Sequence, residues 1–471
     1  MTFWSSGVMM DGVWLCALLL VSWALIQSLP FLRRLALPPP LLAGIIGLFL
    51  GPSAMGFLPF QPETFEFIVY HGLALIFISV SLQPAPPRTD GRAVSLGSRS
   101  MAFAIPFMAV TQGLIGLTVV AGYWALGFGE LHPGVGLMLP LAFGQGPGQA
   151  LSLGTAWEAS GMADGGQIGL IMSAIGFIWC AAVGVPWASY GARKGWATPL
   201  PDPPDEPMLG ETLDPKVDTT ALHVSAVGVV YLVTAGLLVL ITDAIADNTQ
   251  LVAMVWGFHF LIGMAVGLFV RTVLARTPGK GLLKREELSR IATVVVAFST
   301  TAAISAVKLS VLVGMWGPIL MVTMLGGVAT FAAALWLTKR VFPEAPFEHG
   351  LVWFGAATGT LHTGLALLQS LDPELRGSAP NSAVVGSAGA LLLSAPLLLF
   401  VIPYTITDWQ SRFPGVTFAA IGILAIYMAL LVVGWRLGAP LRFLRPLGSI
   451  WPSQPHPQIP PSEMVDIAAE R

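Results

Sequence analysis

The chain has 471 residues, of which 55% are hydrophobic and only 10% are charged, whereas soluble domains carry about a quarter charged residues. This composition excludes an ordinary soluble enzyme, a disordered protein and a fibrous protein. The 23 Lys and Arg nearly balance the 25 Asp and Glu, and the net charge of −2 gives no indication of a nucleic-acid partner. The sequence therefore predicts a polytopic membrane protein that lies in a lipid bilayer.

Thirteen apolar runs are candidates for membrane-spanning helices, because about 18 or more apolar residues can cross the hydrocarbon core. In chain order they are 12–30, 40–58, 67–83, 101–128, 134–157, 166–190, 221–242, 250–270, 291–307, 310–338, 349–371, 382–407 and 416–435. A linker rich in proline and acidic residues at 195–220 separates the sixth run from the seventh, and a cytoplasmic tail is expected at 441–471. The cysteines Cys16 and Cys180 lie in apolar runs and predict neither a disulfide nor a metal site.

The charges between the runs predict the orientation, because short cytoplasmic loops collect Lys and Arg. Arg33 and Arg34 follow the first run, and Arg193 follows the sixth. If these residues are cytoplasmic, the N-terminus is outside and the fifth run cannot be a single crossing. It is predicted to be a re-entrant hairpin near 134–160. The alternative is thirteen ordinary spans, with several loops that break the charge rule.

The same argument applies to the second half of the chain, where basic residues follow the eighth, tenth and last runs. It predicts a second hairpin near 349–375 and a cytoplasmic C-terminus. Residues 1–194 and 221–407 then each hold five spans and one hairpin, and 408–440 is an extra C-terminal span. With five crossings per half, the second half starts on the opposite face of the membrane. The predicted fold class is an all-α polytopic membrane protein with two inverted-topology repeats, as in secondary transporters.

Two short sequence similarities support the repeat. Gly47-Leu48-Phe49 of the second run has a counterpart in Gly267-Leu268-Phe269 of the eighth. Phe143-Gly144 with Gly148 has a counterpart in Phe354-Gly355 with Gly359, and these lie in the two predicted hairpins. The alternative is chance similarity in a glycine-rich chain.

The first hairpin segment contains glycines, a proline and two glutamines at membrane depth. Irregular backbone is tolerated there only inside protein or around a water-filled cavity, and the free N–H groups at a helix start can bind a carboxylate. The alternative is close packing of small residues beside a proline kink. We predict substrate-binding positions at Gly144, Gln145, Gly146, Gly148, Gln149 and Thr155.

The second hairpin segment adds hydroxyl groups and a histidine. The predicted substrate-binding positions are Thr358, Gly359, Thr360, His362 and Thr363. Threonine hydroxyls can bind a carboxylate or coordinate Na⁺, although each could instead bond to a carbonyl of its own helix. His362 could bind an anion or carry a coupled proton, and a purely structural histidine is the alternative.

Within the predicted boundaries no Asp or Glu lies well inside a span. Proton-driven carriers work through buried titratable groups, whereas Na⁺ needs only oxygen ligands, so Na⁺ is the favoured coupling ion. Ser152, Thr300 and Thr301 are candidate Na⁺ ligands. No cofactor other than this ion is expected. Neither an enzyme nor a channel is favoured, because no catalytic constellation and no ring of charged residues can be recognised.

The chain resembles the sodium/glutamate symporter family in three places: the glycine pattern of the second run (Gly44, Gly47, Gly51), the segment 144–157 and the segment 355–364. Members of that family have a Gly-Gly-His-Gly-Thr-Gly run in the first hairpin, where this chain has Gln and Pro. The resemblance implies two inverted halves, a homodimer and elevator-type alternating access. It also implies that Gly144, Gly146, Gly148, Thr155, Gly359 and Thr363 line the site.

The predicted function is Na⁺-coupled symport of glutamate or a related small carboxylate across the cell (inner) membrane. The alternative is a proton-coupled carrier, or a carrier of another organic anion, built on an inverted-repeat fold. The expected partners are the small anionic substrate, Na⁺, the lipid bilayer and a second copy of the chain.

Overall fold

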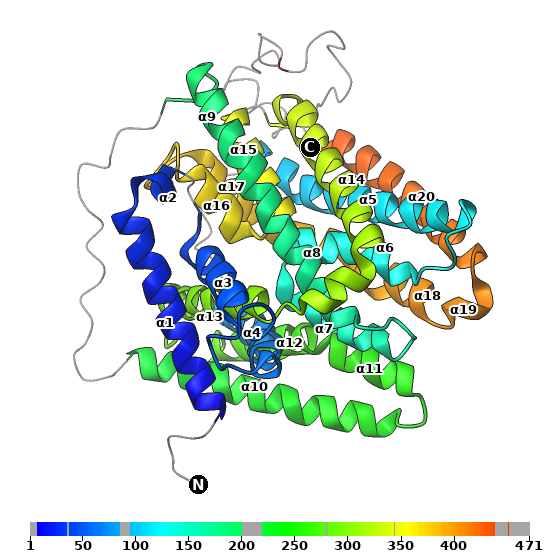
Figure 1. Ribbon diagram of the computed structural model, residues 1–471. Coiled ribbons are helices and arrows are strands. Elements are labelled where there is room, and N and C mark those ends of the chain that lie inside the picture. The colour runs from blue at the N-terminus through cyan, green and yellow to red at the C-terminus, as the bar shows by residue number, and fades with distance from the viewer. Residues whose placement is uncertain are drawn as a thin grey trace. The chain divides into compact units, whose positions relative to one another are not determined.

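The computed structural model describes residues 7–34, 37–84, 95–199, 219–277, 279, 281–342, 344–438 and 451. The regular structure within these ranges is entirely helical, which confirms the predicted all-α class (Figure 1). Most of the 195–220 linker and of the 441–471 tail lies outside the described residues, so their predicted roles are not addressed by the structure.

The helices fall into two sets on either side of the linker. The first set is α1 (Gly7–Ser28), α2 (Pro30–Arg34), α3 (Pro39–Leu50), α4 (Pro62–Leu82), α5 (Leu96–Ala125), α6 (Pro133–Pro140), the π-helix η2 (Leu141–Gln145), α7 (Pro147–Glu158), α8 (Gly165–Trp179), η3 (Cys180–Gly184) and α9 (Val185–Arg193). The second set is α10 (Thr219–Ala244), α11 (Thr249–Gly257), α12 (His259–Leu274), α13 (Arg285–Ser305), α14 (Leu309–Val341), α15 (Pro346–Thr358), α16 (Leu361–Leu368), α17 (Ser378–Pro396), η4 (Leu397–Val401), α18 (Ile402–Ile406), α19 (Trp409–Arg412) and α20 (Gly415–Gly438).

Within the described ranges, nine helical segments are long and apolar enough to cross a membrane, or ten if the bent pair α11–α12 is one span. They correspond to ten of the eleven predicted crossings, so the chain has the character of a multi-pass membrane protein. The exception is the second run, 40–58, whose helix α3 has only 12 residues. A helix of this length is about 18 Å long, which is less than the ~30 Å hydrocarbon core. The prediction of one full-length helix there was wrong, because Gly51 and Pro52 stop the helix.

The helices group into two compact units. Unit 1 contains α1–α4, α7, α8 as far as Ala174, α10–α13 and α14 as far as Ile319. Glycines let its helices approach closely, since a Cβ on Gly47 of α3 would lie 2.1 Å from the Ser305 hydroxyl of α13. Likewise a Cβ on Gly267 of α12 would lie 2.0 Å from the Ser81 hydroxyl of α4. Glycine at these positions therefore sets the spacing of the helices.

Unit 2 contains α5, α6, η2, the end of α8, η3, α9, α14 from Leu320 onward and α15–α20. Its core is rich in aromatic side chains that are almost fully buried, among them Trp187, Phe347, Trp353, Phe354 and Trp435. The ring of Trp187 makes edge-to-face contacts with those of Phe347 and Phe354, an arrangement that adds to the apolar burial.

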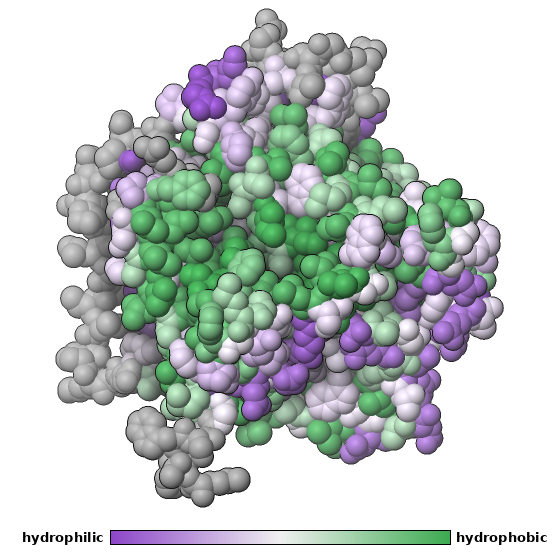
Figure 2. All heavy atoms as spheres, viewed as in Figure 1, coloured by the Kyte–Doolittle hydropathy of each residue, from purple (hydrophilic) through white to green (hydrophobic). Residues whose placement is uncertain are grey.

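Many large apolar side chains are exposed, as expected for helices that face lipid. On α10, Val229, Leu232 and Leu240 are 61%, 72% and 68% exposed. Figure 2 shows hydrophobic side chains over much of the face in view. Apolar exposure on this scale is unusual for a soluble monomer and agrees with the membrane character deduced from composition.

Candidate functional site

A helical hairpin in unit 2 forms the centre of the candidate site. α15 ends at Thr358, Gly359 has an irregular backbone (φ −150°, ψ −98°), and α16 begins at Leu361. The two helices pack closely, because a Cβ on Gly355 would lie only 2.6 Å from the Cα of Gly364. The predicted glycines of this segment therefore allow the chain to turn and fold back on itself.

The hydroxyl groups of the hairpin cap the start of α16. The Thr360 side chain accepts a hydrogen bond from the Thr363 backbone N–H at 3.4 Å, and the two hydroxyls lie 3.2 Å apart. Thr358 instead donates to the carbonyl of Phe354 at 2.9 Å, the bond to its own helix that was the structural alternative. The side chain of His362 is exposed in the first turn of α16.

A glutamine that the sequence analysis did not select supports the end of α15. The side chain of Gln112 is buried in the middle of α5 and donates from Nε2 to the carbonyl of Ala357 at 2.8 Å and to the Thr330 hydroxyl at 2.9 Å. It therefore connects α5 and α14 to the residue two positions before Gly359. Its signal in the sequence was an amide in the middle of an otherwise apolar run, 101–128.

The two predicted glycine-rich segments meet within unit 2. A Cβ on Gly176 of α8 would lie 2.6 Å from the carbonyl of Thr358 and 3.0 Å from the ring of Phe143 in η2. The end of η2, which includes Gly144 and Gln145, and the end of α15 thus lie against the same turn of α8. Of the candidate positions, Gly144, Gln145 and the hairpin residues 358–363 belong to unit 2.

The remaining predicted positions of the first segment lie in unit 1. Gly146 has φ 86°, a conformation that favours glycine, and ends η2 before α7 begins. A Cβ on Gly148 would lie 3.0 Å from the Leu73 side chain of α4, and α7 packs against α8 where the Thr155 hydroxyl approaches Gly166. Gln149 is buried in α7. α7 and α8 approach each other through Gly154 and Gly165.

The three candidate Na⁺ ligands are placed on two helices of unit 1. Ser152 of α7 donates to the carbonyl of Gly257 at 2.9 Å. Thr301 of α13 donates to the carbonyls of Ala297 at 3.0 Å and Pro40 at 3.2 Å, and Thr300 is its neighbour on the same helix. The hydroxyls of Ser152 and Thr301 therefore bond to different carbonyls.

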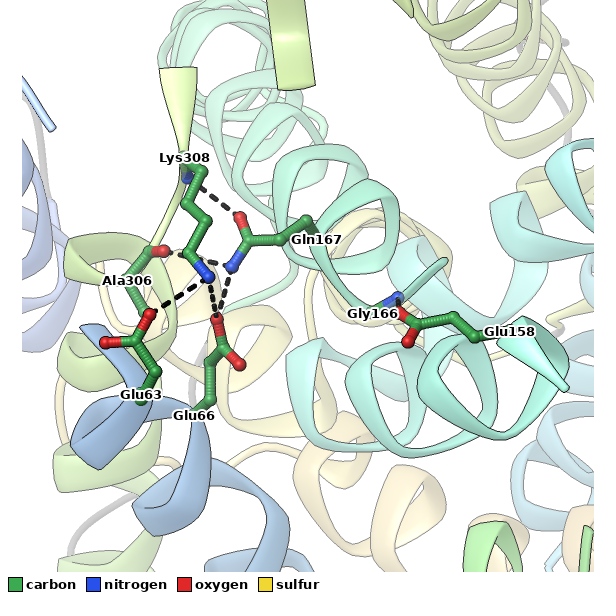
Figure 3. A network of polar contacts seen from close by, with 7 residues as sticks. All are labelled: Glu63, Glu66, Glu158, Gly166, Gln167, Ala306 and Lys308. Atoms are coloured by element: carbon green, nitrogen blue, oxygen red, sulfur yellow. Dashed lines mark hydrogen bonds and ion pairs between the residues drawn. The ribbon is translucent and has the colours of Figure 1, made fainter. Parts of the chain in front are cut away.

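A polar network in unit 1 joins the starts of α4, α8 and α14 (Figure 3). Lys308 Nζ lies 3.2 Å from Glu63 Oε1 and 3.4 Å from Glu66 Oε1. Gln167 donates to Glu66 at 2.6 Å and accepts from the Lys308 backbone N–H at 2.8 Å. Burial lowers the pKa of Lys308, but the carboxylates of Glu66 and Glu63 outweigh this effect and leave the pKa above its ordinary value.

Glu158 extends this region at the end of α7, where Oε1 accepts from the Gly166 backbone N–H at 3.2 Å. Burial raises the pKa of the Glu158 carboxyl, and the bond from Gly166 opposes the change. Glu158 therefore caps the start of α8 with a carboxylate whose charge is disfavoured by its surroundings.

Comparison of the chain with family models, with curated proteins and with solved structures finds no match. The resemblance to sodium/glutamate symporters therefore stays a prediction from the quoted residues, and the function has to be argued from the geometry.

Proposed function

We propose that the protein is a secondary active transporter that carries a small carboxylate, with glutamate or a related acid as the substrate and Na⁺ as the coupling ion. The observation that carries the proposal is a repeated series of interruptions. An interrupted pair of helices, α6–η2–α7 in the first half and α15–α16 in the second, is followed by a long helix broken by a π-helix, α8–η3–α9 and α17–η4–α18. Pro186 and Pro403 are each the second residue after that π-helix.

The packing of unit 1 supports an internal repeat. Gly47 of α3 packs against Ser305 of α13, and Gly267 of α12 packs against Ser81 of α4. If α3 corresponds to α12 and α4 to α13, each contact is the counterpart of the other. A pseudo-twofold axis produces such an exchange, and inverted repeats with broken helices are typical of secondary transporters.

The division of the helices between the two units supports two parts with different functions. Unit 1 contains the early helices of both halves, α1–α4 and α10–α13, and unit 2 contains most of the later ones. An elevator-type transporter needs one body that carries the substrate and one that stays fixed. We assign the substrate to unit 2, because it contains the α15–α16 hairpin.

The start of α16 supports a carboxylate as the substrate. The first N–H groups of a helix have no acceptor within the helix, and the positive end of the helix dipole favours an anion. Thr360 caps one of these groups at Thr363, and His362 is exposed in the same turn. A carboxylate can accept hydrogen bonds there, and Gly359 leaves the approach free of a side chain.

Uptake into proteoliposomes under separately imposed gradients of Na⁺ and H⁺ tests the proposal, with radiolabelled glutamate and small dicarboxylates as substrates. We expect uptake driven by the Na⁺ gradient. Thr360→Val should raise KM, because the cap of α16 is lost. Thr118→Val is the matched control, because this hydroxyl donates to the carbonyl of Leu114 in its own helix. No gradient-dependent uptake of any acidic amino acid or dicarboxylate by the wild type refutes the proposal.

A proton-coupled carrier is the second candidate, and one residue favours it. His259, at the break between α11 and α12, is buried and has carbonyl oxygens beside both ring nitrogens. Uptake that follows the H⁺ gradient and ignores Na⁺ would favour this candidate over Na⁺ symport.

A further inference from the structure

An open pocket in unit 1 lies where the ends of three apolar helices meet. α4 ends at Leu82, α12 ends at Leu274 and α13 begins at Arg285, and α4 packs against both of the other helices (Figure 1). α4 and α13 are long enough to cross a membrane, and α12 is the second part of the bent pair. Their common end is therefore expected at the depth of the lipid headgroups.

The lining of the pocket combines an apolar wall with positive charge. Its volume is about 400 Å³, within the range of roughly 300–1,000 Å³ that is usual for ligand pockets. The apolar wall includes Leu82, Leu274 and Leu283, and the first and last of these belong to a buried apolar cluster of unit 1. Arg271 and Arg276 line the same pocket.

The arginines around the pocket bond to neutral acceptors. Arg271 donates from Nη1 to the carbonyl of Gln83 at 3.4 Å. Arg285 donates from Nη1 to Gln83 Oε1 at 3.3 Å and from Nη2 to the carbonyl of Pro84. No described carboxylate lies within ion-pair distance of Arg271, Arg276 or Arg285. The positive charge at the end of α4 is therefore not compensated by the described part of the chain.

The excess of positive charge is local. Between residues 271 and 290 the sequence has six Lys or Arg and two Glu, whereas the net charge of the whole chain is −2. The two acids are Glu286 and Glu287, and neither lines the pocket. Glu287 accepts from the Thr220 hydroxyl at 3.3 Å and lies 3.5 Å from Arg290 Nη1, so its charge is already matched.

This combination of groups suits a phosphate that is attached to an apolar chain. Guanidinium groups form strong, charge-assisted hydrogen bonds with phosphate oxygens, and the described contacts of Arg271 use one of its five N–H donors. A free phosphate would leave the apolar wall without a partner, whereas a phospholipid covers it with the first part of an acyl chain. The charge rule predicts that this end of α12 is cytoplasmic, and basic pockets on that side of membrane proteins bind anionic headgroups.

We propose that the pocket binds one anionic phospholipid, with its phosphate at Arg271 and Arg276 and an acyl chain along Leu82, Leu274 and Leu283. Arg285 acts as a positioning residue, because its two bonds hold the end of α4 that forms one side of the pocket. The pocket lies in unit 1, whereas the substrate is assigned to unit 2, and lipid binding does not rest on the proposed transport function.

The test is native mass spectrometry of the full chain in detergent, titrated with phosphatidylglycerol and with phosphatidylcholine of the same acyl chains. We expect the first phosphatidylglycerol to bind more tightly than phosphatidylcholine. Arg276 is exposed, and Arg276→Gln should lower the affinity for phosphatidylglycerol about fivefold, as expected for one basic group near a membrane surface. The matched control is Arg436→Gln, which removes a basic residue in the last turn of α20 and should leave the affinity unchanged. Equal binding of the two lipids by the wild type, or wild-type affinity in Arg276→Gln, overturns the proposal.

A second variant tests the pocket without changing the charge. Ala275 is exposed and lines the pocket, so Ala275→Trp should fill it and lower the affinity for phosphatidylglycerol several-fold. Ala244→Trp is the control, because Ala244 is an exposed alanine at the end of α10 in the same unit. Wild-type affinity in Ala275→Trp overturns the assignment of the lipid to this pocket.

Inorganic phosphate distinguishes a lipid site from a site for the free anion. At the same concentration as the lipid it should not displace phosphatidylglycerol, because it gains nothing from the apolar wall. Displacement would show a phosphate site and would overturn the proposal of a lipid. These measurements need neither substrate nor an ion gradient, so a failure of the proposed transport function leaves them intact.

Discussion

Two interrupted helices, α15–α16 in unit 2 and α11–α12 in unit 1, leave backbone groups without partners inside the helix. Different kinds of side chain bond to those groups in the two places. At Gly359 the free backbone groups are met by the neutral hydroxyl of Thr360, and the helices pack through glycines. At the end of α11 the free carbonyls are met by Tyr70, Ser152 and His259. One interruption depends on neutral donors and close packing, and the other includes a group that can gain or lose a charge.

In the proposed transporter, this difference would separate substrate recognition from ion coupling. A carboxylate needs donors that stay in place during the cycle, and neutral hydroxyl and N–H groups do not change with pH. A coupling or regulatory ion needs a site whose state changes, and only a titratable or cation-binding group provides one. We therefore expect changes at the neutral groups Thr360 and Gln112 to be insensitive to pH and changes in the charged network of unit 1 to depend on charge.

The largest expected effect comes from Gly364→Val. A Cβ at Gly364 would lie 2.3 Å from the carbonyl of Val352 and 2.9 Å from the backbone nitrogen of Ala356, and backbone cannot move aside as a flexible side chain can. Overpacking costs about 1–3 kcal/mol or more, so the hairpin should open and uptake should be lost. Thermal unfolding in detergent measures the stability. Gly422→Val on α20 is the control, because a Cβ at Gly422 meets nothing within 4 Å.

Gln112→Leu should have the next largest effect. The variant leaves the carbonyl of Ala357 without its 2.8 Å donor and the Thr330 hydroxyl without its 2.9 Å partner, and an unsatisfied buried group costs about 1–3 kcal/mol. We expect a several-fold rise in KM and a lower unfolding temperature, equal at pH 6 and pH 8. Thr111→Val is the control, since its hydroxyl bonds to Phe107 of the same helix. A pH-dependent defect would contradict the neutral character of this region.

Glu66→Ala tests the charged network of unit 1 against Glu63→Ala. The Glu66 side chain is 27% exposed, forms an ion pair with Lys308 and accepts a hydrogen bond from Gln167. The Glu63 side chain is 68% exposed and forms an ion pair with Lys308. Exposed ion pairs contribute about 0–1 kcal/mol, so Glu66→Ala should lower the free energy of unfolding by about 1 kcal/mol and Glu63→Ala by less. Chemical denaturation measures both. Equal effects would show that the Gln167 bond adds nothing.

The pH dependence of that network follows from Lys308. Its pKa is raised above the ordinary 10.5 by Glu66 and Glu63 despite burial, so its stabilising contribution is complete below pH 10.5 and is lost only as the pH rises through the raised pKa. The difference between wild type and Glu66→Ala should therefore stay constant from pH 6 to pH 9.

The sequence contained enough information for the helical class and for the positions of most spans, because long uncharged runs can only be helices in a bilayer. It also marked the interruption at Gly359, where glycines and threonines occur together. The length of α3 was not predictable from hydropathy, because the apolar residues continue beyond Gly51 into a turn that remains apolar.

The polar contacts between distant segments could not be predicted. Gln112 and Ala357 are 245 residues apart, and His259 and Tyr70 are 189 apart, so no local pattern joins them. His362 was predicted as a site residue because it lies beside glycines and threonines in the sequence. The folded chain also places the carbonyl oxygens of Trp256 and Tyr70 beside the ring nitrogens of His259, a contact that the sequence did not indicate.

The smallest expected effect is that of Glu158→Gln at the end of α7. Burial raises the pKa of the Glu158 carboxyl above its ordinary value of 4.5, so the folded protein holds this proton more tightly than the unfolded chain. Stability contributed by the neutral form is complete below pH 4.5 and is lost as the pH rises through the raised pKa. Gln keeps the oxygen that accepts from Gly166 at 3.2 Å and never ionises.

The variant should therefore have a slightly higher unfolding temperature than wild type at pH 7, and the two should converge at pH 4. Scanning calorimetry in detergent at both pH values measures this, with Glu130→Gln as the control because that side chain is exposed in the loop before α6. If Glu158→Gln is the less stable protein at pH 7, the carboxylate contributes more as a charged cap of α8 than burial removes. Charge at the ends of α7 would then hold unit 1 together, and the contrast with the neutral interruption at Gly359 would be sharper still.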